Sequence, residues 1–388
     1  MRLRPIQLAV PALALMMTTL AACGGGAATP TAAPTKAPAA APTSAPAAPT
    51  AAPTKPAATS APAAAPTTAA PTKAFKVGLV TDVGKVDDKS FNQSAWEGVQ
   101  KVQKDMGADV KYIETTDPKD YQKNIAQFGD AGYDVIVTVG FALGEDTYAA
   151  AKKYKNIKFI GVDQFQAKDD QHPDIPLPNL VGLVFEEDKA GYLAGALAAL
   201  MSKSGTVGSV LGTDAVPPVW RYGEGYRAGA KAVKPNTQLN IVYHNDVGFD
   251  KTFSDPEWGK TTARSMIDKG ADVIFGAGGK TGNGALLGAA DAGKYCIGVD
   301  TDQYLTVPEA QKVMLSSAMK LITPGVSDLV KTVKDGTFKG GNFNGQVGLA
   351  PYHDLDSKIP ADVKSKIDEL TKGISSGSIK TNVPPAKP

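Results

Sequence analysis

The chain has 388 residues, and its 41 Lys and Arg nearly balance its 39 Asp and Glu, giving a formal net charge of +2. A charge this close to neutral leaves no basic footprint for binding nucleic acid. The two cysteines lie far apart, at Cys23 and at Cys296 in the apolar run "YCIGVD", and the three histidines show no metal-ligand spacing. We therefore expect no nucleic-acid partner, no disulfide framework, no metal site and no cofactor.

The first residues, "MRLRPIQLAVPALALMMTTLAAC", carry two Arg and then an apolar stretch from Ile6 to Leu20. This pattern is typical of a secretory signal peptide, and the stretch is shorter than the about 20 residues of a membrane span. Leu20-Ala21-Ala22-Cys23 matches the bacterial lipobox. We expect a signal peptide over residues 1–22 and acylation of Cys23, which would anchor the protein to the extracytoplasmic side of the cell membrane. An ordinary signal peptide with an incidental cysteine is the alternative.

Residues 23–73 are almost entirely Ala, Pro, Thr, Ser and Gly after Cys23, with a few Lys. A segment without large apolar residues cannot bury a core, and frequent Pro favours an extended chain. We expect a disordered stalk after the lipidated cysteine.

From Phe75 onward, runs rich in Val and Ile alternate with amphipathic stretches, which predicts parallel sheets covered by helices on both faces. The predicted strands are 76–81, 110–114, 135–139, 158–161, 180–185, 206–211, 238–242, 273–276, 295–299 and 313–317. The predicted helices are 90–105, 121–131, 145–154, 186–202, 222–233, 258–269, 284–292, 322–333 and 361–372.

Two passages echo each other, "FGDAGYDVIVTVGFALGEDTYAAA" and "MIDKGADVIFGAGGKTGNGALLGAA", and the strands after them end in "GVDQ" and "GVDTDQ". This internal similarity indicates an α/β protein of two doubly wound lobes. We expect lobe 1 to span 74–178 and 307–340, and lobe 2 to span 179–306 and 341–380. In doubly wound sheets ligands bind outside the carboxyl ends of the strands, so the polar corners of both lobes should face one cleft.

The strings "VGLVTDVGKVDDKSFNQSAWEG", "GADVIFGAGGKTGNG", "IGVDTDQ" and "LSSAMK", together with the lipobox and stalk, resemble the basic membrane protein family. These are lipid-anchored substrate-binding proteins of ABC transporters, of the Med or purine-nucleoside-receptor type. The resemblance covers Phe75 to about Lys372. It implies a type I periplasmic-binding fold with two lobes joined by three hinge strands, a nucleoside ligand and an ABC permease as partner. We expect a monomer.

The resemblance also implies a set of ligand-binding residues. Phe91 and Phe275 would sandwich a base, Asn92 and Asp163 would read its hydrogen-bonding edge, and Asp82 would order the first turn. Asp300 and Lys320 would hold a ribose, because a carboxylate accepts and an ammonium donates hydrogen bonds. The segment "AVPPVWRYGEGYRAGA" occupies the place of a loop-to-helix contact in the family, so Trp220 is a further candidate.

Each of these residues also has a purely structural interpretation. Phe91 could pack the start of its helix, Asn92 could cap it, Phe275 could belong to the core, and Trp220 is more often a packing residue. Asp163 could pair within a hinge, Asp300 could be a cap, and Lys320 could be a solvated surface residue. Asp88 and Ser90 fit helix capping better than ligand contact. The loop "GAGGKTGNG" lacks the spacing of a phosphate-binding P-loop, which favours nucleosides over nucleotides.

The sequence thus predicts a receptor that closes around its ligand and docks on a permease, and not an enzyme. Two alternatives stay open: a sugar or autoinducer receptor of the same fold, and a nucleoside-cleaving enzyme that uses the acids Asp82, Asp87 and Asp88.

Overall fold

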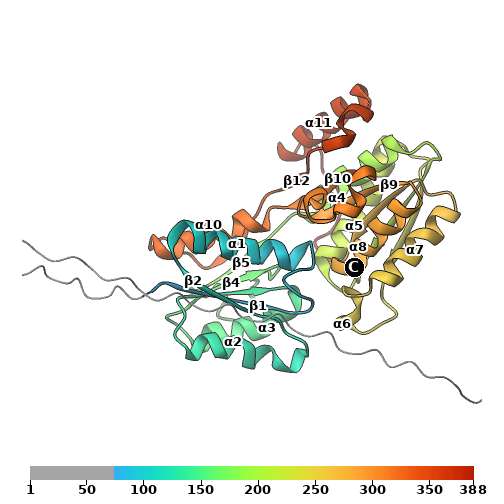
Figure 1. Ribbon diagram of the computed structural model, residues 1–388. Coiled ribbons are helices and arrows are strands. Elements are labelled where there is room, and N and C mark those ends of the chain that lie inside the picture. Colours follow the sequence, from blue (N-terminus) through green and yellow to red (C-terminus); the bar gives the residue numbers. More distant parts are fainter. Residues whose placement is uncertain (1–73) are drawn as a thin grey trace, which may run out of the picture. The chain divides into compact units, whose positions relative to one another are not determined.

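Two parallel β-sheets, each covered by helices on both faces, make up residues 74–388, the part of the chain that the computed structural model describes (Figure 1). These residues belong to one compact unit. The expected signal peptide, the acylated Cys23 and the stalk lie outside the described residues. The predicted fold class, two doubly wound α/β lobes, is confirmed.

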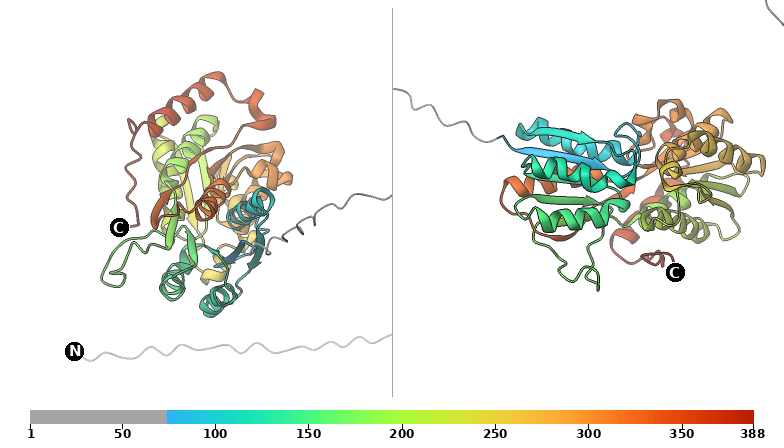
Figure 2. Two further views of the ribbon diagram at one scale, coloured as in Figure 1. Left: turned by 90° about the vertical axis from the view of Figure 1, so that its left-hand side faces the viewer. Right: turned by 90° about the horizontal axis from the view of Figure 1, so that it is seen from below.

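The first sheet has the strand order β11-β5-β4-β3-β1-β2. Its strands are β1 (Lys76–Thr81), β2 (Asp109–Ile113), β3 (Val135–Val139), β4 (Lys158–Val162), β5 (Leu180–Val184) and β11 (Gly341–Asn344). Helices α1 (Phe91–Met106) and α10 (Ile322–Lys334) share one hydrophobic cluster with this sheet, and α2 (Tyr121–Asp130) and α3 (Gly144–Lys153) share another. The two helix pairs lie on opposite faces of the sheet, as Figures 1 and 2 show.

The second sheet repeats this plan with the order β12-β10-β9-β8-β6-β7. Its strands are β6 (Thr206–Leu211), β7 (Gln238–Tyr243), β8 (Val273–Ala277), β9 (Tyr295–Asp300), β10 (Met314–Lys320) and β12 (Val347–Leu349). Helices α4 (Glu187–Met201), α5 (Pro217–Val233) and α11 (Ala361–Ser375) share one cluster with it, and α7 (Pro256–Asp268) and α8 (Gly279–Asp291) share another. The short helices α6 (Phe249–Thr252) and α9 (Gln303–Thr306) lie in loops.

The sheets are parallel because most of their strands are buried on both faces. In β3 every residue of "VIVTV" is buried, and β8, β9 and β5 are almost as apolar. Continuous apolar strands of this kind need helices on both sides, and α-helical crossovers make the strand pairs parallel. Among the described strand pairs, β10 with β12 is antiparallel.

The boundaries of the lobes differ from those expected from sequence, because strand pairing and not chain order decides where a strand belongs. β5 pairs with β4 in the first sheet, although we expected residues 179–306 in lobe 2. β10 pairs with β9 in the second sheet, although 307–340 was expected in lobe 1. β11 lies in the first sheet, although 341–380 was expected in lobe 2. The chain therefore passes between the sheets after β5, after β10 and after β11.

Helices α4 and α5 make the most extensive contact between helices of the second lobe. A Cβ on Gly195 would overlap the carbonyl oxygen of Tyr226, and a Cβ on Gly229 would overlap that of Tyr192. Glycine lets the two helix backbones touch, and α4 is buried almost all round as a result.

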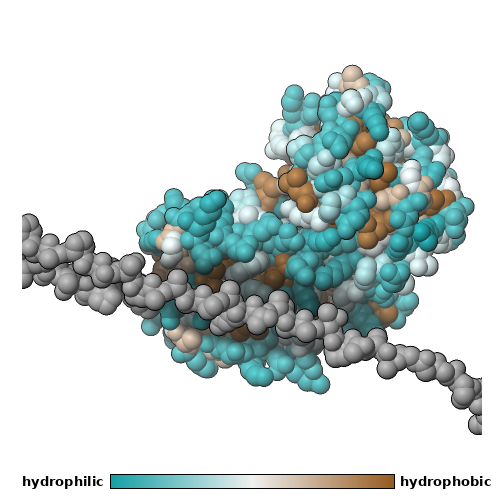
Figure 3. Space-filling model, viewed as in Figure 1, coloured by the Kyte–Doolittle hydropathy of each residue, from teal (hydrophilic) through white to brown (hydrophobic). Residues whose placement is uncertain are grey.

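The outer surface fits a folded domain in water. The face in Figure 3 is mostly hydrophilic, with apolar side chains in small patches. None of the helices in residues 74–388 is both long enough and apolar enough to cross a bilayer. Cys296, the free cysteine of the described residues, is buried as expected.

Candidate ligand-binding site

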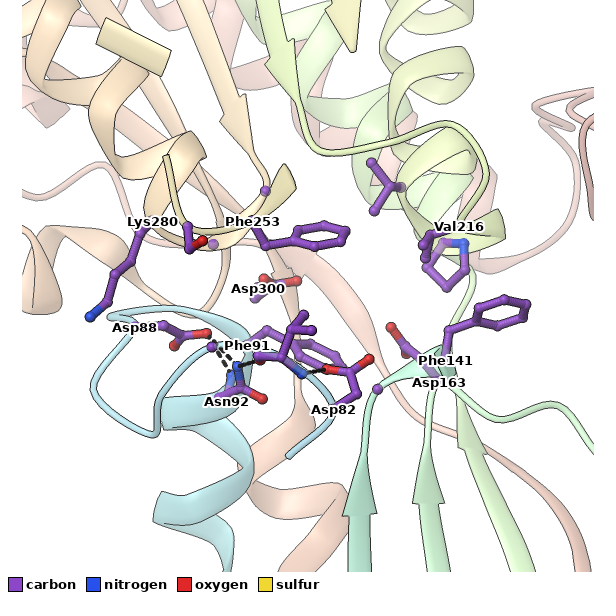
Figure 4. Close-up of a pocket in the computed structure, with 18 of the residues that line it drawn as sticks. Asp82, Asp88, Phe91, Asn92, Phe141, Asp163, Val216, Phe253, Lys280 and Asp300 are labelled. Atoms are coloured by element: carbon purple, nitrogen blue, oxygen red, sulfur yellow. Dashed lines mark hydrogen bonds between the residues drawn. The ribbon is translucent and has the colours of Figure 1, made fainter. Parts of the chain in front are cut away.

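A cavity of about 460 Å³ lies at the carboxyl ends of strands from both sheets (Figure 4). Its wall includes residues that directly follow or end β1, β2, β3 and β4 in the first lobe, and β8, β9 and β10 in the second. The volume is within the usual range for small-molecule sites, about 300–1,000 Å³. Both lobes thus contribute their polar corners to one cavity, as the repeated sequence pattern predicts.

Six of the eight residues expected at the site line this cavity: Asp82, Phe91, Asn92, Asp163, Asp300 and Lys320. They come from four different strand ends and from the first turn of α1, so the fold gathers residues that are up to 238 positions apart in the chain.

Phe275 is not among the lining residues, which corrects the expected sandwich. It lies in the middle of β8, is fully buried, and stacks on Tyr226 with a centroid distance of 5.3 Å. Successive side chains of a strand point to opposite faces of the sheet, and this position faces the helix layer. The structural interpretation of Phe275, a core residue, is the correct one.

Trp220 also lies outside the cavity lining. It is 7% exposed in the second turn of α5, whereas its neighbours Pro218, Val219 and Tyr222 do line the cavity. A helix turns about 100° per residue, so Trp220 faces away from the side that its neighbours present.

Phe253 is one of the aromatic residues that the second lobe contributes to the cavity. It follows α6 in the loop between β7 and α7, and Figure 4 shows its ring across the cavity from Phe91, with Asp300 between them in this view. Phe249 and, from the first lobe, Phe141 line the same cavity. Sequence reasoning missed all three because it searched strand ends with acids and not the loops that follow.

The two "GVD" corners hold Asp163 and Asp300 in matching places. Asp163 follows β4, Asp300 ends β9, and these strands occupy the same position in their sheets. Both residues have a positive φ, 61° and 64°, a conformation that Asp tolerates better than most residues. The left-handed turn directs each carboxylate into the cavity instead of along the strand.

Lys320 lies at the centre of a buried charge cluster. Its Nζ is 2.6 Å from Asp163 Oδ2 and 3.1 Å from Glu187 Oε1, and the rings of Phe91, Phe185 and Tyr222 surround it at 5.0, 5.3 and 5.9 Å from their centroids. Burial lowers the pKa of Lys320, but the carboxylates of Asp163, Glu187 and Asp300 more than offset it, so the net pKa is raised. Lys320 is therefore a charged buried residue and not a solvated surface lysine.

Glu187 is the acid of this cluster that sequence reasoning missed. It begins α4, is fully buried, and pairs with Arg221, whose guanidinium also donates to the carbonyl of Phe185 at 2.8 Å. Burial raises the pKa of Glu187, while Lys320 acts against that change. The signal for it was the "FEEDKAG" turn directly after a buried strand.

Asn92 does not cap α1, and its side chain instead joins the turn before the helix to Asp88. Its Nδ2 donates to the carbonyl of Val83 at 3.0 Å and to Asp88 Oδ2 at 3.1 Å, while its Oδ1 is buried without a hydrogen-bond partner among the described residues. Asp88 accepts hydrogen bonds from the backbone N–H groups of Ser90, Asn92 and Gln93, so it caps α1 as expected.

Asp82 and Asp300 are two buried carboxylic acids of the cavity whose pKa values are raised. Burial raises the pKa of Asp82 to about 7, although the backbone N–H of Val83 donates to it. Burial likewise raises the pKa of Asp300 to about 6, against the opposing effects of Lys320 and the Ser90 hydroxyl. Asp82 lies against Gly140, where a Cβ would overlap its carboxylate. Acids with such environments cluster at functional sites.

The turn before α1 connects the first lobe to the second. Its four residues make these contacts with the second lobe: Asp87 Oδ1 with Lys280 Nζ (3.0 Å), Asp88 O with Asn283 Nδ2 (2.8 Å), Lys89 O with Gln303 Nε2 (3.0 Å) and Thr306 Oγ1 (2.8 Å), and Ser90 Oγ with Asp300 Oδ2 (2.7 Å). The lobes therefore meet directly at one end of the cavity. A ligand that fills the cavity lies beside this contact between the lobes.

Chemically, the lined cavity offers aromatic faces, several acceptor oxygens and the ammonium groups of three lysines. Within residues 74–388, no group of three His, Cys, Asp or Glu is arranged to hold a metal ion. Such a site suits a neutral, flat ligand with several hydrogen-bond donors.

Two doubly wound lobes around a cavity of this kind define a solute-binding protein of the type I periplasmic-binding fold. A solved solute-binding protein of an ABC transporter system from Aeropyrum pernix K1 superposes with a TM-score of 0.69 at 25% sequence identity, covering 79% of this chain and 92% of its own.

The sequence profile described as "ABC transporter substrate-binding protein PnrA-like" matches residues 75–351, and the chain belongs to this family. It is 36% identical to the "CD4+ T-cell-stimulating antigen" of Listeria monocytogenes, over 82% of this chain and 90% of the relative. It is 32% identical to the "ABC transporter nucleoside-binding protein BmpA" of Lactococcus lactis, over 76% and 86%. The resemblance found in the sequence is confirmed.

Proposed function

We propose that this protein is the extracytoplasmic receptor of an ABC importer, that it binds a purine nucleoside between its lobes, and that acylated Cys23 anchors it to the cell membrane. The observation that carries the ligand assignment is the pair of rings, Phe91 and Phe253, that face one cavity from opposite lobes. Stacking of a base on an aromatic ring contributes roughly 1–3 kcal/mol.

The polar groups around these rings fit the rest of a nucleoside. Asn92 Oδ1 and Asp163 Oδ1 are buried acceptors without a partner among the described residues, so each gains by accepting from an N–H or O–H group of the ligand. Asp300 accepts from ribose hydroxyls, and Lys320, which uses one of its three N–H donors on Asp163 Oδ2, donates to the ligand as well. Asp82 holds the turn that carries these groups.

The charge of the cavity favours a nucleoside over a nucleotide. Three lysines line the cavity, Lys85, Lys280 and the buried Lys320, against six acids: Asp82, Asp88, Glu114, Asp163, Asp250 and Asp300. A phosphate would meet carboxylates and lose its hydration without a matching cluster of cations. The printed name of the Lactococcus lactis relative, a nucleoside-binding protein, supports the same class of ligand.

The test is a calorimetric titration of the full chain with inosine, guanosine, adenosine, uridine, hypoxanthine and D-ribose. We expect the purine nucleosides to bind at least about a hundredfold more tightly than hypoxanthine or D-ribose, because each fragment leaves buried polar groups unpaired. Chromatography of the mixtures should recover the nucleosides unchanged. Binding of D-ribose as tight as that of inosine would favour a sugar receptor, and release of hypoxanthine would favour a nucleoside-cleaving enzyme.

The anchor has a separate test. When the chain is expressed in a bacterial host with radiolabelled palmitate, the wild type should carry the label and fractionate with membranes. Cys23→Ala should lose the label and leave the membrane fraction, because one lost cysteine removes the acylation site. Label that persists in Cys23→Ala would contradict the proposal.

A further inference from the structure

The orientation of the Asn92 side-chain amide is determined by its surroundings. Both groups that Nδ2 contacts, the carbonyl of Val83 and the Oδ2 of Asp88, are acceptors. A flipped amide would turn its oxygen toward two other oxygens at about 3 Å, so the nitrogen must face them. The amide nitrogen is therefore fully used, and Oδ1, a buried acceptor without a partner among the described residues, is the free polar atom of a side chain that lines the cavity.

Asp88 has no capacity left for a ligand. Its Oδ1 accepts from the N–H groups of Ser90 (2.9 Å) and Gln93 (3.1 Å), and its Oδ2 accepts from the backbone N–H and the Nδ2 of Asn92 (3.0 and 3.1 Å). A carboxylate has about four acceptor sites, and these four bonds use them. With Asp88 3% exposed and Asn92 5% exposed, water does not compete for them.

We propose that Asp88 is a positioning residue that sets the hydrogen-bond polarity of the ligand site: it holds Asn92 as an acceptor, so the site selects purine nucleosides that carry an N–H donor where Asn92 meets the base. This inference rests on the proposed nucleoside ligand. The inference adds to that proposal which kind of group the site prefers at one edge of the base, and it names Asp88 as the residue that determines this preference.

The backbone of Asp88 connects the same residue to the second lobe. Its carbonyl accepts from Asn283 Nδ2 at 2.8 Å, and Asn283 Oδ1 in turn accepts from Gln303 Nε2 at 2.7 Å. Asp88 thus contacts the Asn92 amide through its side chain and the second lobe through its backbone. We therefore expect the Asn92 amide to be held most firmly when the lobes are together.

The substitution Asp88→Asn tests this role because it keeps the size of the side chain and changes one acceptor into a donor. The new NH2 must face either the N–H groups of Ser90 and Gln93 or the two N–H groups of Asn92, and both choices bring donors together. A rotated Asn92 amide relieves the second conflict by giving its oxygen to position 88. Its own NH2 then faces the cavity, and the preference for donors weakens or reverses.

The experiment measures the affinity of the full chain for three pairs of probes in which one member carries an N–H donor that the other lacks. The pairs are guanosine and inosine, adenosine and purine riboside, and inosine and purine riboside. We expect the wild type to favour the donor-bearing member of at least one pair by about tenfold or more, since a buried acceptor would otherwise stay unpaired. In Asp88→Asn that ratio should fall to about one or invert.

Asp169→Asn is the matched control. Asp169 also accepts from backbone N–H groups two and three residues further on, Gln171 at 2.8 Å and His172 at 2.7 Å, but it does not line the cavity. Its selectivity should equal that of the wild type. Asp88→Asn with an unchanged ratio, or with the same loss for every nucleoside, would overturn the inference. A wild type that binds no purine nucleoside would instead overturn the proposed function.

A second measurement does not require Asp88→Asn to fold. In nitrogen-15 spectra of the wild type, the side-chain NH2 signals of Asn92, assigned by their loss in Asn92→Leu, should exchange slowly with water both before and after inosine is added. Slow exchange is expected because both protons bond to the protein. Fast exchange in the free protein, or exchange that becomes slow only with inosine, would contradict the positioning by Asp88.

Discussion

Lys320 Nζ lies 2.6 Å from Asp163 Oδ2, so the last residue of β10 in the second sheet forms an ion pair with the residue that follows β4 in the first. Glu187 and Arg221 extend this pair into a buried cluster beside the points where the chain crosses between lobes. The charge of Lys320 therefore stabilises the relative position of two lobes as well as one wall of the cavity.

Replacing Lys320 with Met should lower the free energy of unfolding by about 3–5 kcal/mol, because Asp163 and Glu187 would stay buried without their cation. Urea denaturation of the ligand-free chain measures this change. Lys101→Met is the matched control: Lys101 pairs with Asp105 on the exposed side of α1, and loss of such a pair should cost less than about 1 kcal/mol. Equal losses in both variants would show that the cluster is no more than a surface ion pair.

Substitution of Phe253 should weaken ligand binding, whereas substitution of Phe275 should lower the stability of the fold. Phe253→Ala removes a ring from the cavity wall, so we expect inosine to bind roughly 5- to 150-fold more weakly, with little change in thermal midpoint. Phe275→Ala empties a fully buried core position and should lower the free energy of unfolding by about 3–5 kcal/mol. Calorimetry and urea denaturation of both variants make the comparison, and a Phe275→Ala protein that folds well but loses inosine would contradict the assignment of roles.

The sequence predicted the architecture well because the relevant signals are local and repeated. Apolar runs of five or six residues between amphipathic stretches indicate buried parallel strands, and the duplicated "GVD" corners place Asp163 and Asp300 at equivalent strand ends. The lobe boundaries were wrong for β5, β10 and β11, because only the pairing of strands distant in sequence decides which sheet they join.

The sequence identified the lining residues of the cavity where a polar residue ends a strand. It failed for residues whose role depends on which face of a helix or strand their side chain occupies. Phe275 lies one residue before the end of the predicted strand 273–276 and in the middle of the observed β8. Because side chains alternate along a strand, its ring points into the core. Phe253 belongs to the loop after α6, whose path depends on long-range packing, such as the bond from Thr252 Oγ1 to the carbonyl of His244 at 3.1 Å. No short-range pattern in the sequence indicates that path.

Asp300 should make affinity and stability depend on pH in opposite directions. Burial raises its pKa from 3.8 to about 6, so between these values the folded, ligand-free protein holds a proton that the unfolded chain releases. The contribution of Asp300 to stability is therefore full below about pH 4 and is lost as the pH rises through 6, a change of about 3 kcal/mol. Binding needs the ionised carboxylate as an acceptor for hydroxyls, so inosine affinity should fall by about tenfold per pH unit below 6.

Titrations with inosine and urea denaturation at pH 7, 6, 5 and 4 test both slopes, and Asp300→Asn serves as the reference because it cannot ionise. Asp82, with its pKa raised to about 7 by burial, adds a stability change of the same sign, which is present in both proteins and cancels in their difference. We expect the difference in stability between wild type and Asp300→Asn to shift against the wild type as the pH rises from 4 to 6, while the affinity of the variant stays level across this interval. If the wild type bound inosine equally well at pH 7 and pH 5, the carboxylate of Asp300 would not contact the ligand. A hydroxyl buried against the neutral acid could not leave the affinity unchanged.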